Sequence, residues 1–324
     1  MQEIKTDLLI IGAGPAGLGA AIYAARSALD FKIVDKFMAG GQIINAEFIE
    51  NYPGFKDNIS GFDLMQSIIE HCKKFNITIE EYSSINKISI YENPEECNQN
   101  NKSCIKPYKF ICHTDSESII SRALIMATGA SPKRLYVEGE SEYIGKGISF
   151  CATCDGALYK DREVMVMGGG NTAIQEALFL TKFAKKVYIV HRRDELRAVK
   201  LLQNRAFEDK KIEFIYSSVI EKFIGKERLE EVVIKDLKNK TKYTKKIDGV
   251  FEYIGINPNS DLVKDLVKLD EGGFVVTNFN METTYEGIFA AGDIRNTPLR
   301  QVITATSDGA VAASYADKYI NDLL

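Results

Sequence analysis

The chain has 324 residues, of which 45% are hydrophobic and 27% are charged, and its formal net charge at pH 7 is -4. This length suits two domains, and the composition is that of a globular protein with a substantial core. The acidic net charge disfavours a nucleic-acid-binding function, and no apolar run reaches the roughly 20 residues of a membrane-spanning helix. Because no signal peptide is visible, we expect a cytoplasmic protein. Six cysteines are too few for a disulfide-stabilised scaffold.

The first feature in chain order is a strand–helix–strand pattern. An apolar run at residues 7–12 precedes a glycine-rich segment and an Ala-rich helical pattern to about Ala28, and a second apolar run follows at Phe31–Val34. The same order recurs at residues 163–167, 173–183 and 186–190. Two such units predict two dinucleotide-binding domains rather than one large sheet.

The first glycine-rich segment is Gly12-Ala-Gly14-Pro15-Ala16-Gly17, a G-x-G-x-x-G motif between a strand and a helix. Gly12 permits a tight turn, Gly14 allows the backbone to approach a pyrophosphate, and Gly17 allows helix and strand to pack closely. Asp35 ends the next strand, where a carboxylate suits an adenosine ribose and repels a 2′-phosphate. The motif predicts a dinucleotide site but does not distinguish FAD from NAD.

Residues 92–107 are rich in Asn, Glu and Lys and have no apolar periodicity, which predicts an exposed loop. Cys97 and Cys104 lie in this segment. Two exposed thiols are favoured over a surface disulfide or a metal site, because no His or third Cys completes a ligand set.

A close cysteine pair occurs in Cys151-Ala-Thr-Cys154-Asp155-Gly156. A C-x-x-C pair can close a redox-active ring, and its surroundings can lower the pKa of one thiol. The adjacent acid, Asp155, can exchange a proton as thiolate becomes thiol. Half of a zinc site is disfavoured, because there is no second C-x-x-C and the chain has only three His. The motif predicts a redox-active dithiol rather than a buried structural pair.

The second glycine-rich segment, Gly168-Gly-Gly170-Asn171-Thr172-Ala173, is a G-x-G-x-x-A motif. The strand after its helix ends in His191-Arg192-Arg193 rather than in an acid. Guanidinium groups bind a 2′-phosphate through charge-assisted hydrogen bonds, so this site favours NADPH over NADH. We expect Arg197, four residues after Arg193, to share a helical face with it. A solvated basic helix start is the alternative.

Two further motifs, Ala127-Thr128-Gly129-Ala130 and the Gly292-Asp293 pair, are weak separately but match a flavoprotein with two dinucleotide-binding domains when taken together with the first motif. The full set of motifs resembles the small, bacterial-type thioredoxin reductases. Its further members are Gly40-Gly41-Gln42, Asn51-Tyr-Pro-Gly54 and Arg300-Gln301-Val302. The cysteine pair precedes the second glycine motif in this chain, whereas larger reductases of the glutathione reductase type carry it near the first.

The resemblance implies an α/β fold of two Rossmann-like, three-layer domains, with an NADPH-binding domain at 131–247 inserted into an FAD-binding domain at 1–130 and 248–324. It also implies a homodimer and no metal. The residues expected at FAD are Gly12, Gly14, Pro15, Ala16, Gly17, Asp35, Gly41, Gln42, Asn51, Thr128, Gly129, Gly292, Asp293, Arg300, Gln301 and Val302. Those expected at NADPH are Gly168, Gly170, Asn171, Thr172, Ala173, His191, Arg192, Arg193 and Arg197.

By the same resemblance, electrons pass from NADPH to FAD, to the cysteine pair and then to thioredoxin. Cys154 is expected beside the flavin as the charge-transfer thiolate, Cys151 attacks the protein substrate, and Asp155 is the acid/base. A hinge rotation of the inserted domain is expected about strands near 130–131 and 248–252.

Other functions remain open at this point. One is a reductase for another thioredoxin- or glutaredoxin-like partner. The reductase of a peroxide-detoxifying system adds an N-terminal thioredoxin-like module, which we do not expect because the first motif begins at residue 12. Ferredoxin– or flavodoxin–NADP reductases lack the cysteine pair. A flavin-binding sensor predicts no disulfide reduction by NADPH.

Overall fold

A computed structural model of the chain describes residues 2–46, 49, 51–57, 59–91 and 107–321. The chain divides into two compact units, unit 1 (Met1–Ser131 with Asn257–Leu324) and unit 2 (Pro132–Ile256). The two segments that join them, β7 (Ala130–Pro132) and β16 (Ile256–Pro258), pair as a two-stranded sheet. Cys97 and Cys104 lie outside the described residues.

The second junction differs from the prediction. Strand β15 (Gly249–Glu252) was expected to begin the returning part of the first domain, but it lies inside the sheet of unit 2, beside β9. All four of its residues are buried. A strand buried on both faces belongs to the unit whose sheet it completes, so the junction falls at 256/257 rather than 247/248.

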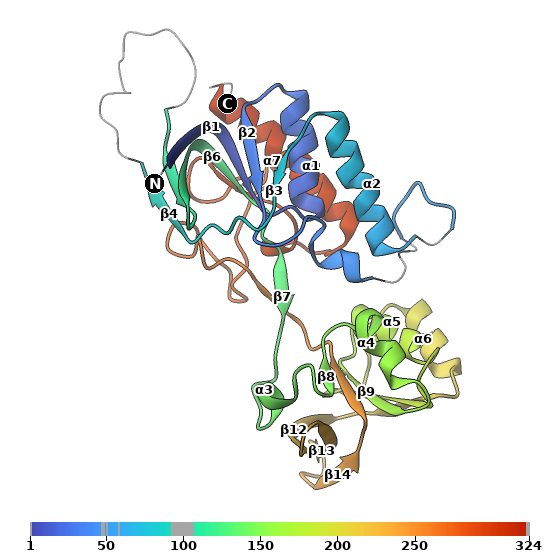
Figure 1. Ribbon diagram of the computed structural model, residues 1–324. Helices are drawn as coiled ribbons and strands as arrows, with labels where there is room; N and C mark the ends of the chain where they lie inside the picture. Colours follow the sequence, from blue (N-terminus) through green and yellow to red (C-terminus); the bar gives the residue numbers. More distant parts are fainter. Residues whose placement is uncertain (1, 47–48, 50, 58, 92–106, 322–324) are drawn as a thin grey trace, which may run out of the picture. The chain divides into compact units, whose positions relative to one another are not determined.

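Unit 1 is built on a seven-stranded sheet (Figure 1). Its strands are β3 (Ile79–Glu80), β2 (Phe31–Val34), β1 (Gln2–Ile11), β6 (Glu117–Met126), β5 (Phe110–His113), β4 (Lys87–Ile90) and β17 (Ile288–Ala290). β1 is parallel to β2 and β6, and the end of β6 is parallel to β17. β4 and β5 form an antiparallel edge.

Helices cover one face of this sheet (Figure 1). They are α1 (Pro15–Arg26), α2 (Gly61–Lys74) and α7 (Val302–Ile320), with short 3-10 turns η1 (Gly41–Asn45) and η4 (Gly292–Ile294). α1 and α7 approach closely because both are rich in Ala and Gly. A Cβ added at Gly309 would lie 1.9 Å from the Ala16 carbonyl oxygen, so a larger residue there would separate the helices. The other face packs against Val263, Val267 and Val275.

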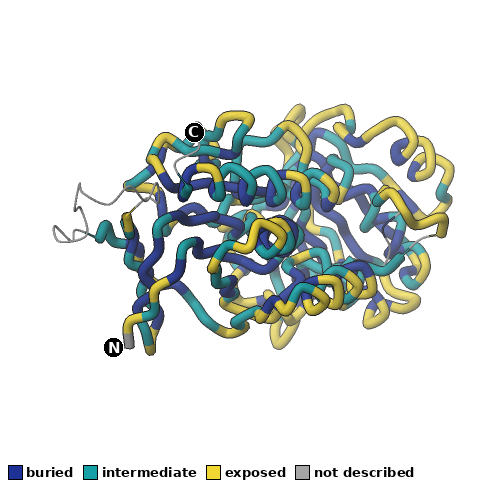
Figure 2. The backbone as a smooth tube through the Cα atoms, turned by 90° about the horizontal axis from the view of Figure 1, so that it is seen from above, coloured by how far each residue is buried: buried dark blue, intermediate teal, exposed yellow. Residues whose placement is uncertain are grey.

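Unit 2 contains a five-stranded parallel sheet. Its strands are β11 (Ile212–Ile215), β10 (Lys186–Val190), β9 (Glu163–Met167), β15 and β8 (Ile148–Ser149). The helical elements are α3 (Glu140–Tyr143), α4 (Ala152–Asp155), η3 (Gly156–Tyr159), α5 (Asn171–Leu180) and α6 (Lys200–Glu208). The central strands of each unit are buried, and Figure 2 shows exposed residues mainly on the outside of the fold.

The second face of the unit 2 sheet is covered by strands rather than helices. β12 (Ser218–Gly225), β13 (Leu229–Asp236) and β14 (Lys242–Lys246) form a separate antiparallel sheet. Ile220, Val232 and Ile234 from this sheet pack against Met165 and Met167 of β9. Unit 2 therefore has helices, a parallel sheet and an antiparallel sheet as its three layers. The predicted α/β class with parallel sheets is confirmed. Among the described residues, no helix is long and apolar enough to span a membrane.

Candidate functional site

The predicted FAD residues of unit 1 gather where its parallel strands end. Gly12 follows β1, Thr128 and Gly129 follow β6, and Gly292 follows β17. The carboxyl ends of parallel strands meet at one edge of a sheet, and ligands of open α/β sheets bind outside that edge. A Cβ added at Gly292 would lie 2.9 Å from the Ala16 Cβ, so the first motif and the late Gly-Asp pair are in contact.

The glycines of the first turn differ in whether the fold itself requires glycine at their positions. Gly12 has a φ of +107°, and a Cβ on Gly17 would lie 1.7 Å from the Gly12 carbonyl oxygen, so both are required by the fold. Gly14 has a φ of -77°, and a Cβ there would meet nothing closer than Gly41 Cα at 3.7 Å. The backbone and the packing would therefore accept a side chain at Gly14. Space beside this helix N-terminus suits a pyrophosphate.

Asp35 lies at the end of β2, as predicted, and its carboxylate holds the turn. It accepts hydrogen bonds from the backbone N–H groups of Ala13 at 2.7 Å and Phe37 at 2.9 Å. The Gln42 side-chain amide donates to the Ala130 carbonyl. Asn51 Nδ2 donates to Gln301 Oε1 at 2.8 Å. These predicted residues are thus tied to one another or to neighbouring backbone within unit 1.

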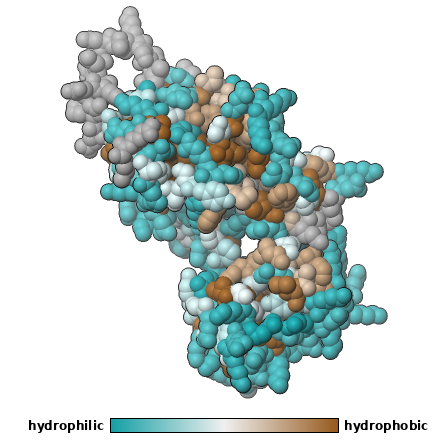
Figure 3. Space-filling model, in the orientation of Figure 1, coloured by the Kyte–Doolittle hydropathy of each residue, from teal (hydrophilic) through white to brown (hydrophobic). Residues whose placement is uncertain are grey.

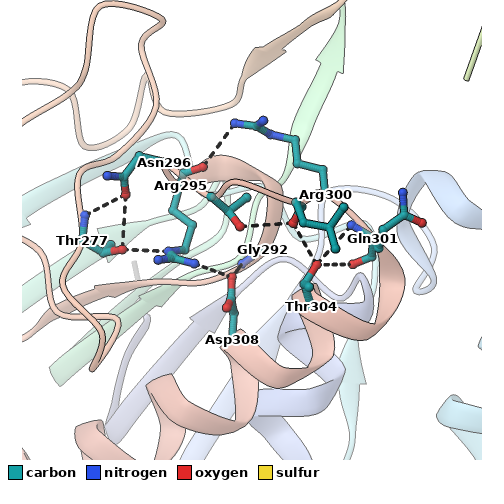
Figure 4. A network of polar contacts seen from close by, with 10 residues as sticks. Thr277, Gly292, Arg295, Asn296, Arg300, Gln301, Thr304 and Asp308 are labelled. Carbon is teal, nitrogen blue, oxygen red and sulfur yellow. Dashed lines mark hydrogen bonds and ion pairs between the residues drawn. The ribbon is translucent and has the colours of Figure 1, made fainter. Parts of the chain in front are cut away.

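A polar network lies at the N-terminal end of α7 (Figure 4). Arg295 Nη1 pairs with Asp308 Oδ2 at 2.9 Å, and the Gly292 N–H donates to the same carboxylate at 3.2 Å. Gln301 and Thr304 form a reciprocal capping box at the start of the helix. The network holds the Gly292 turn against α7. Sequence reasoning missed Arg295 and Asp308, because a single acid inside an Ala-rich helix carries no motif.

Arg300 and Asp293 carry the charge of this end of unit 1. The Arg300 guanidinium lies 4.1 Å from the centre of the Phe274 ring, and its Nε is buried with no hydrogen-bond partner among the described residues. Burial raises the pKa of the Asp293 carboxyl, and the nearby Arg300 acts against that rise. A buried donor without a partner is costly unless another group supplies an acceptor. The phosphates of FAD are such acceptors.

Asn259 is a second residue that the sequence did not indicate. Its Nδ2 donates to the Thr128 carbonyl at 2.8 Å, and its backbone carbonyl accepts from Thr128 Oγ1 at 2.8 Å. Its Oδ1 also accepts from Ser131 Oγ at 2.7 Å. Asn259 therefore fixes the turn after β6 and the start of the joining segment.

The redox pair of unit 2 is present as a disulfide between Cys151 and Cys154. Cys151 is the N-cap of α4, and the Cys154 N–H donates to Cys151 Sγ at 3.2 Å. Cys154 is exposed and Cys151 is half-buried. Asp155 ends the same helix. The structure thus brings the three predicted catalytic residues into one short helical turn.

Two side chains accept hydrogen bonds from the backbone of this turn. The Ala152 N–H donates to Tyr253 Oη at 2.8 Å, and the Cys151 N–H donates to Ser149 Oγ at 3.0 Å. Burial, reinforced by the charge of Glu176, raises the pKa of Tyr253, so its hydroxyl stays protonated. The buried N–H groups of the motif are therefore satisfied, which favours a single backbone geometry for the disulfide.

The second glycine turn repeats the division seen in the first. Gly168 has a φ of +136°, and a Cβ there would lie 2.3 Å from the Tyr253 carbonyl oxygen. A Cβ on Gly169 would lie 2.7 Å from the His191 ring. Gly170 has a φ of -91° and open space around a Cβ. Both motifs thus leave one glycine, at the helix N-terminus, that neither the backbone conformation nor the packing requires.

The basic loop after β10 folds back onto this turn. The N–H groups of Arg197 and Ala198 donate to the Gly169 carbonyl at 2.7 and 3.0 Å, and the Val199 N–H donates to Asn171 Oδ1 at 2.8 Å. Residues 191–199 form no helix, and α6 begins at Lys200. The prediction that Arg193 and Arg197 share a helical face is therefore wrong, because backbone bonds to the glycine turn hold this segment as a loop.

This loop lines a cavity of about 410 Å³. The residues that line it are Arg192, Arg193, Asp194, Glu195, Leu196, Arg197, Ser217, Leu237 and Lys238. His191 comes directly before the lining residues and is buried, and burial together with the Arg197, Arg193 and Arg192 charges lowers its pKa. The three arginines are brought together as predicted, beside the N-terminus of α5. Their charge and bidentate geometry suit a phosphate dianion.

Each of the two α/β units has a glycine turn at a helix N-terminus, and unit 2 also has a C-x-x-C disulfide. This combination defines a class of protein that binds dinucleotides and interconverts a dithiol and a disulfide. The family model described as pyridine nucleotide-disulphide oxidoreductase matches residues 6–309. The chain belongs to that family.

The chain is similar to thioredoxin reductases over almost the full length of both proteins. A thioredoxin reductase of Bacillus subtilis is 42% identical over 325 aligned residues, which cover 100% of this chain and 98% of the relative. A crystal structure of Lactococcus lactis thioredoxin reductase has 38% identity and a TM-score of 0.89, and covers 98% of this chain and 99% of its own. A thioredoxin reductase of T. acidophilum has 32% identity and a TM-score of 0.87, with 99% of both chains covered.

Proposed function

We propose that the chain is an NADPH-dependent thioredoxin-disulfide reductase that contains FAD. The observation that carries this proposal is the Cys151–Cys154 disulfide in the same unit as a glycine turn and an arginine-lined cavity. A nicotinamide site and a redox disulfide on one unit suit electron transfer from NADPH to a disulfide substrate. The full-length likeness to thioredoxin reductases supports thioredoxin as that substrate.

Unit 1 is proposed to hold FAD. The glycine turn and the N-terminus of α1 bind the pyrophosphate, Asp35 faces the adenosine ribose, and the segment from Gly292 to Val302 holds the rest of the cofactor through Asp293, Arg300 and Gln301. When bound, FAD supplies two-electron chemistry between the nicotinamide and the disulfide. The open space at Gly14 supports this placement, as does the buried Arg300 Nε, which has no hydrogen-bond partner within the part of the chain that the structure describes.

Unit 2 is proposed to hold NADPH. The glycine turn and the N-terminus of α5 (Gly168, Gly170 and 171–173) bind the pyrophosphate, and Arg192, Arg193 and Arg197 bind the 2′-phosphate, with His191 behind them. The open space at Gly170 and the cavity lined by the three arginines support this placement.

Thiol–disulfide exchange completes the reaction. Once the pair is reduced, the Cys151 thiolate attacks one sulfur of the thioredoxin disulfide and the other sulfur leaves as a thiolate. Cys154 then attacks Cys151 in the mixed disulfide, which releases dithiol thioredoxin and restores the Cys151–Cys154 bond. Asp155 moves the proton that accompanies each thiolate–thiol change. The division of roles between the two cysteines is part of the proposal.

Rotation of unit 2 about the joining segments is proposed as well. The disulfide has to meet the flavin with water excluded and then meet a bulky protein, and one geometry does not serve both needs. The hinge is placed at β7 and β16, where the chain crosses between units. An engineered, reversible crosslink between the units should abolish thioredoxin turnover when closed and restore it on release. Undiminished turnover in a verified crosslinked form would refute the rotation.

A homodimer and a cytoplasmic location are also proposed. The first is tested by light scattering of the purified holoprotein, and the second by fractionation of the source cells. A thioredoxin-like partner other than thioredoxin itself would use the same site.

The deciding experiment follows NADPH oxidation with thioredoxin and a reporter disulfide. NADH and reduced ferredoxin serve as alternative donors. We expect a yellow protein that releases FAD on denaturation and turns over rapidly only with NADPH and thioredoxin. Reduction with ferredoxin alone, or bound flavin without disulfide reduction, would contradict the proposal.

A further inference from the structure

The arginine-lined cavity of unit 2 has one cation that does not come from the arginine loop. Lys238 belongs to the turn between β13 and β14, more than 40 residues after Arg197, yet it lines the same cavity. The outer surface of this antiparallel sheet is hydrophilic in Figure 3, and β14 is mostly exposed. Leu237, the apolar residue of this turn, is 41% exposed, so burial in a core does not account for the position of the turn against the arginine loop.

Backbone hydrogen bonds account for that position. The Ser217 N–H donates to the Arg193 carbonyl at 3.0 Å, and the Leu237 N–H donates to the Ser217 carbonyl at 2.7 Å. Asp236 Oδ1 accepts from the Lys238 N–H at 2.7 Å and shapes the turn. The chain from the arginine loop to the turn is therefore continuous in hydrogen bonds. These backbone hydrogen bonds fix the turn that carries Lys238 beside the arginine loop.

Lys238 already contacts an acid at the rim of the cavity. Its Nζ lies 3.3 Å from Asp194 Oδ2, and both side chains are about two-thirds exposed. The ammonium lowers the pKa of Asp194, so this carboxylate is ionised at neutral pH. An exposed ion pair is weak and is easily exchanged for a stronger anion.

The balance of charge favours such an exchange. Four cationic residues (three arginines and Lys238) line the cavity against two acids, Asp194 and Glu195. A phosphate dianion carries more charge than one carboxylate and offers three acceptor oxygens. Arginines bind it through their planar forks, whereas a flexible lysine adds a point charge from the side that the arginines leave open.

The geometry points to Lys238 as a further specificity residue of the nicotinamide site. It would leave Asp194 to bind the 2′-phosphate of NADPH together with Arg192, Arg193 and Arg197. This inference rests on the proposed function, because it assumes that the cavity receives that phosphate.

The test uses the FAD-loaded protein and measures binding by calorimetry. The ligands are adenosine 2′,5′-bisphosphate, which carries the phosphate in question, and 5′-AMP, which lacks it. Lys238→Gln should weaken the bisphosphate about threefold to tenfold, the range expected for a partly exposed charged contact, and should leave 5′-AMP unchanged. Asp194→Asn should strengthen the bisphosphate, because it removes the acid that competes for Lys238.

Lys240→Gln is the matched control. Lys240 lies in the same turn, carries the same charge and does not line the cavity, so the bisphosphate should bind that variant as it binds the wild type. Equal losses in Lys238→Gln and Lys240→Gln, or no loss in Lys238→Gln, would overturn the role of Lys238. A wild-type protein that does not distinguish the bisphosphate from 5′-AMP would instead overturn the NADPH assignment itself.

Discussion

The two glycine turns of this chain share a motif but differ in what the next strand delivers. In unit 1 the strand after the helix ends in Asp35, whose carboxylate accepts from the Ala13 N–H inside the turn. In unit 2 it ends in His191, whose ring packs against Gly169, and the following arginines fold over the turn and line a cavity. The same backbone turn is therefore followed by an acidic residue in unit 1 and by basic residues in unit 2. On the proposed assignment, the turn provides the dinucleotide site in both units, and the residues after the second strand select which dinucleotide binds.

The largest expected effect concerns the Cys151–Cys154 disulfide, which lies in unit 2. Cys151→Ser and Cys154→Ser should each abolish thioredoxin turnover and keep bound FAD. Cys154→Ser leaves Cys151 as a free thiol. A thioredoxin that lacks its resolving cysteine is first converted at its remaining cysteine to the mixed disulfide with 5-thio-2-nitrobenzoate. The Cys151 thiolate should attack that cysteine sulfur, release thionitrobenzoate and leave a trapped reductase–thioredoxin disulfide. Mass spectrometry of the adduct identifies the sulfur. An adduct formed through Cys154 in the Cys151→Ser protein, and none through Cys151, would reverse the two roles.

The two open glycines allow a matched test of the shared motif. Gly14→Ala should weaken FAD binding and Gly170→Ala should weaken NADPH binding, each at least about tenfold, because the methyl group enters space that a pyrophosphate needs. Both residues have ordinary negative φ values, so the free energy of unfolding should stay unchanged or rise by about 0.4–1 kcal/mol. Cofactor titration and thermal unfolding of the apoprotein measure the two quantities.

Gly17→Ala is the control for that pair. Its Cβ would lie 1.7 Å from the Gly12 carbonyl oxygen, so this variant should lose stability as well as FAD. If Gly14→Ala destabilised the apoprotein as much as Gly17→Ala does, the open space at Gly14 would be structural and the argument for a ligand would fail.

The role of the positive charge that follows β10 is tested by replacing two of its arginines with neutral residues. Arg192→Gln with Arg193→Gln should raise the KM for NADPH at least about tenfold, since each charged hydrogen bond contributes about 1.5–3 kcal/mol. The KM for NADH should change little, because NADH lacks the 2′-phosphate. Equal changes for both nucleotides would show that these arginines do not recognise that phosphate.

A smaller effect is expected on the pH dependence of stability, because the two units differ in how a buried acid is paired. In unit 1, Asp308 is paired with Arg295, whereas in unit 2 Glu252 is buried beside another acid, Glu140. Burial and the Glu140 charge raise the pKa of Glu252 to about 8. A raised folded-state pKa means that stability falls as pH rises from about 4.5 through about 8, by at most about 1.4 kcal/mol per pH unit.

Glu252→Gln should remove that dependence. We expect denaturant midpoints close to wild type at pH 5 and higher than wild type at pH 8.5. Asp308→Asn is the comparison, because it leaves the Arg295 charge unpaired and should destabilise the protein at both pH values. A Glu252→Gln protein with the wild-type pH slope would show that Glu252 does not titrate in this range.

The sequence alone determined the local features of this protein. Strand limits at Phe31–Val34, Glu163–Met167 and Lys186–Val190 matched the structure, because buried parallel strands appear as continuous apolar runs. The glycine turns and the C-x-x-C pair were also readable, since each depends on residues within a few positions of one another.

The tertiary structure decided everything that depends on distant partners. It placed Gly249–Glu252 in unit 2 and put an antiparallel sheet on the second face of that unit. It also paired Arg295 with Asp308 and brought Lys238 to the arginine loop. A pattern of apolar and polar residues records which side of a segment is buried, but not which segment covers it. Those choices follow from packing and hydrogen bonds between residues far apart in the chain.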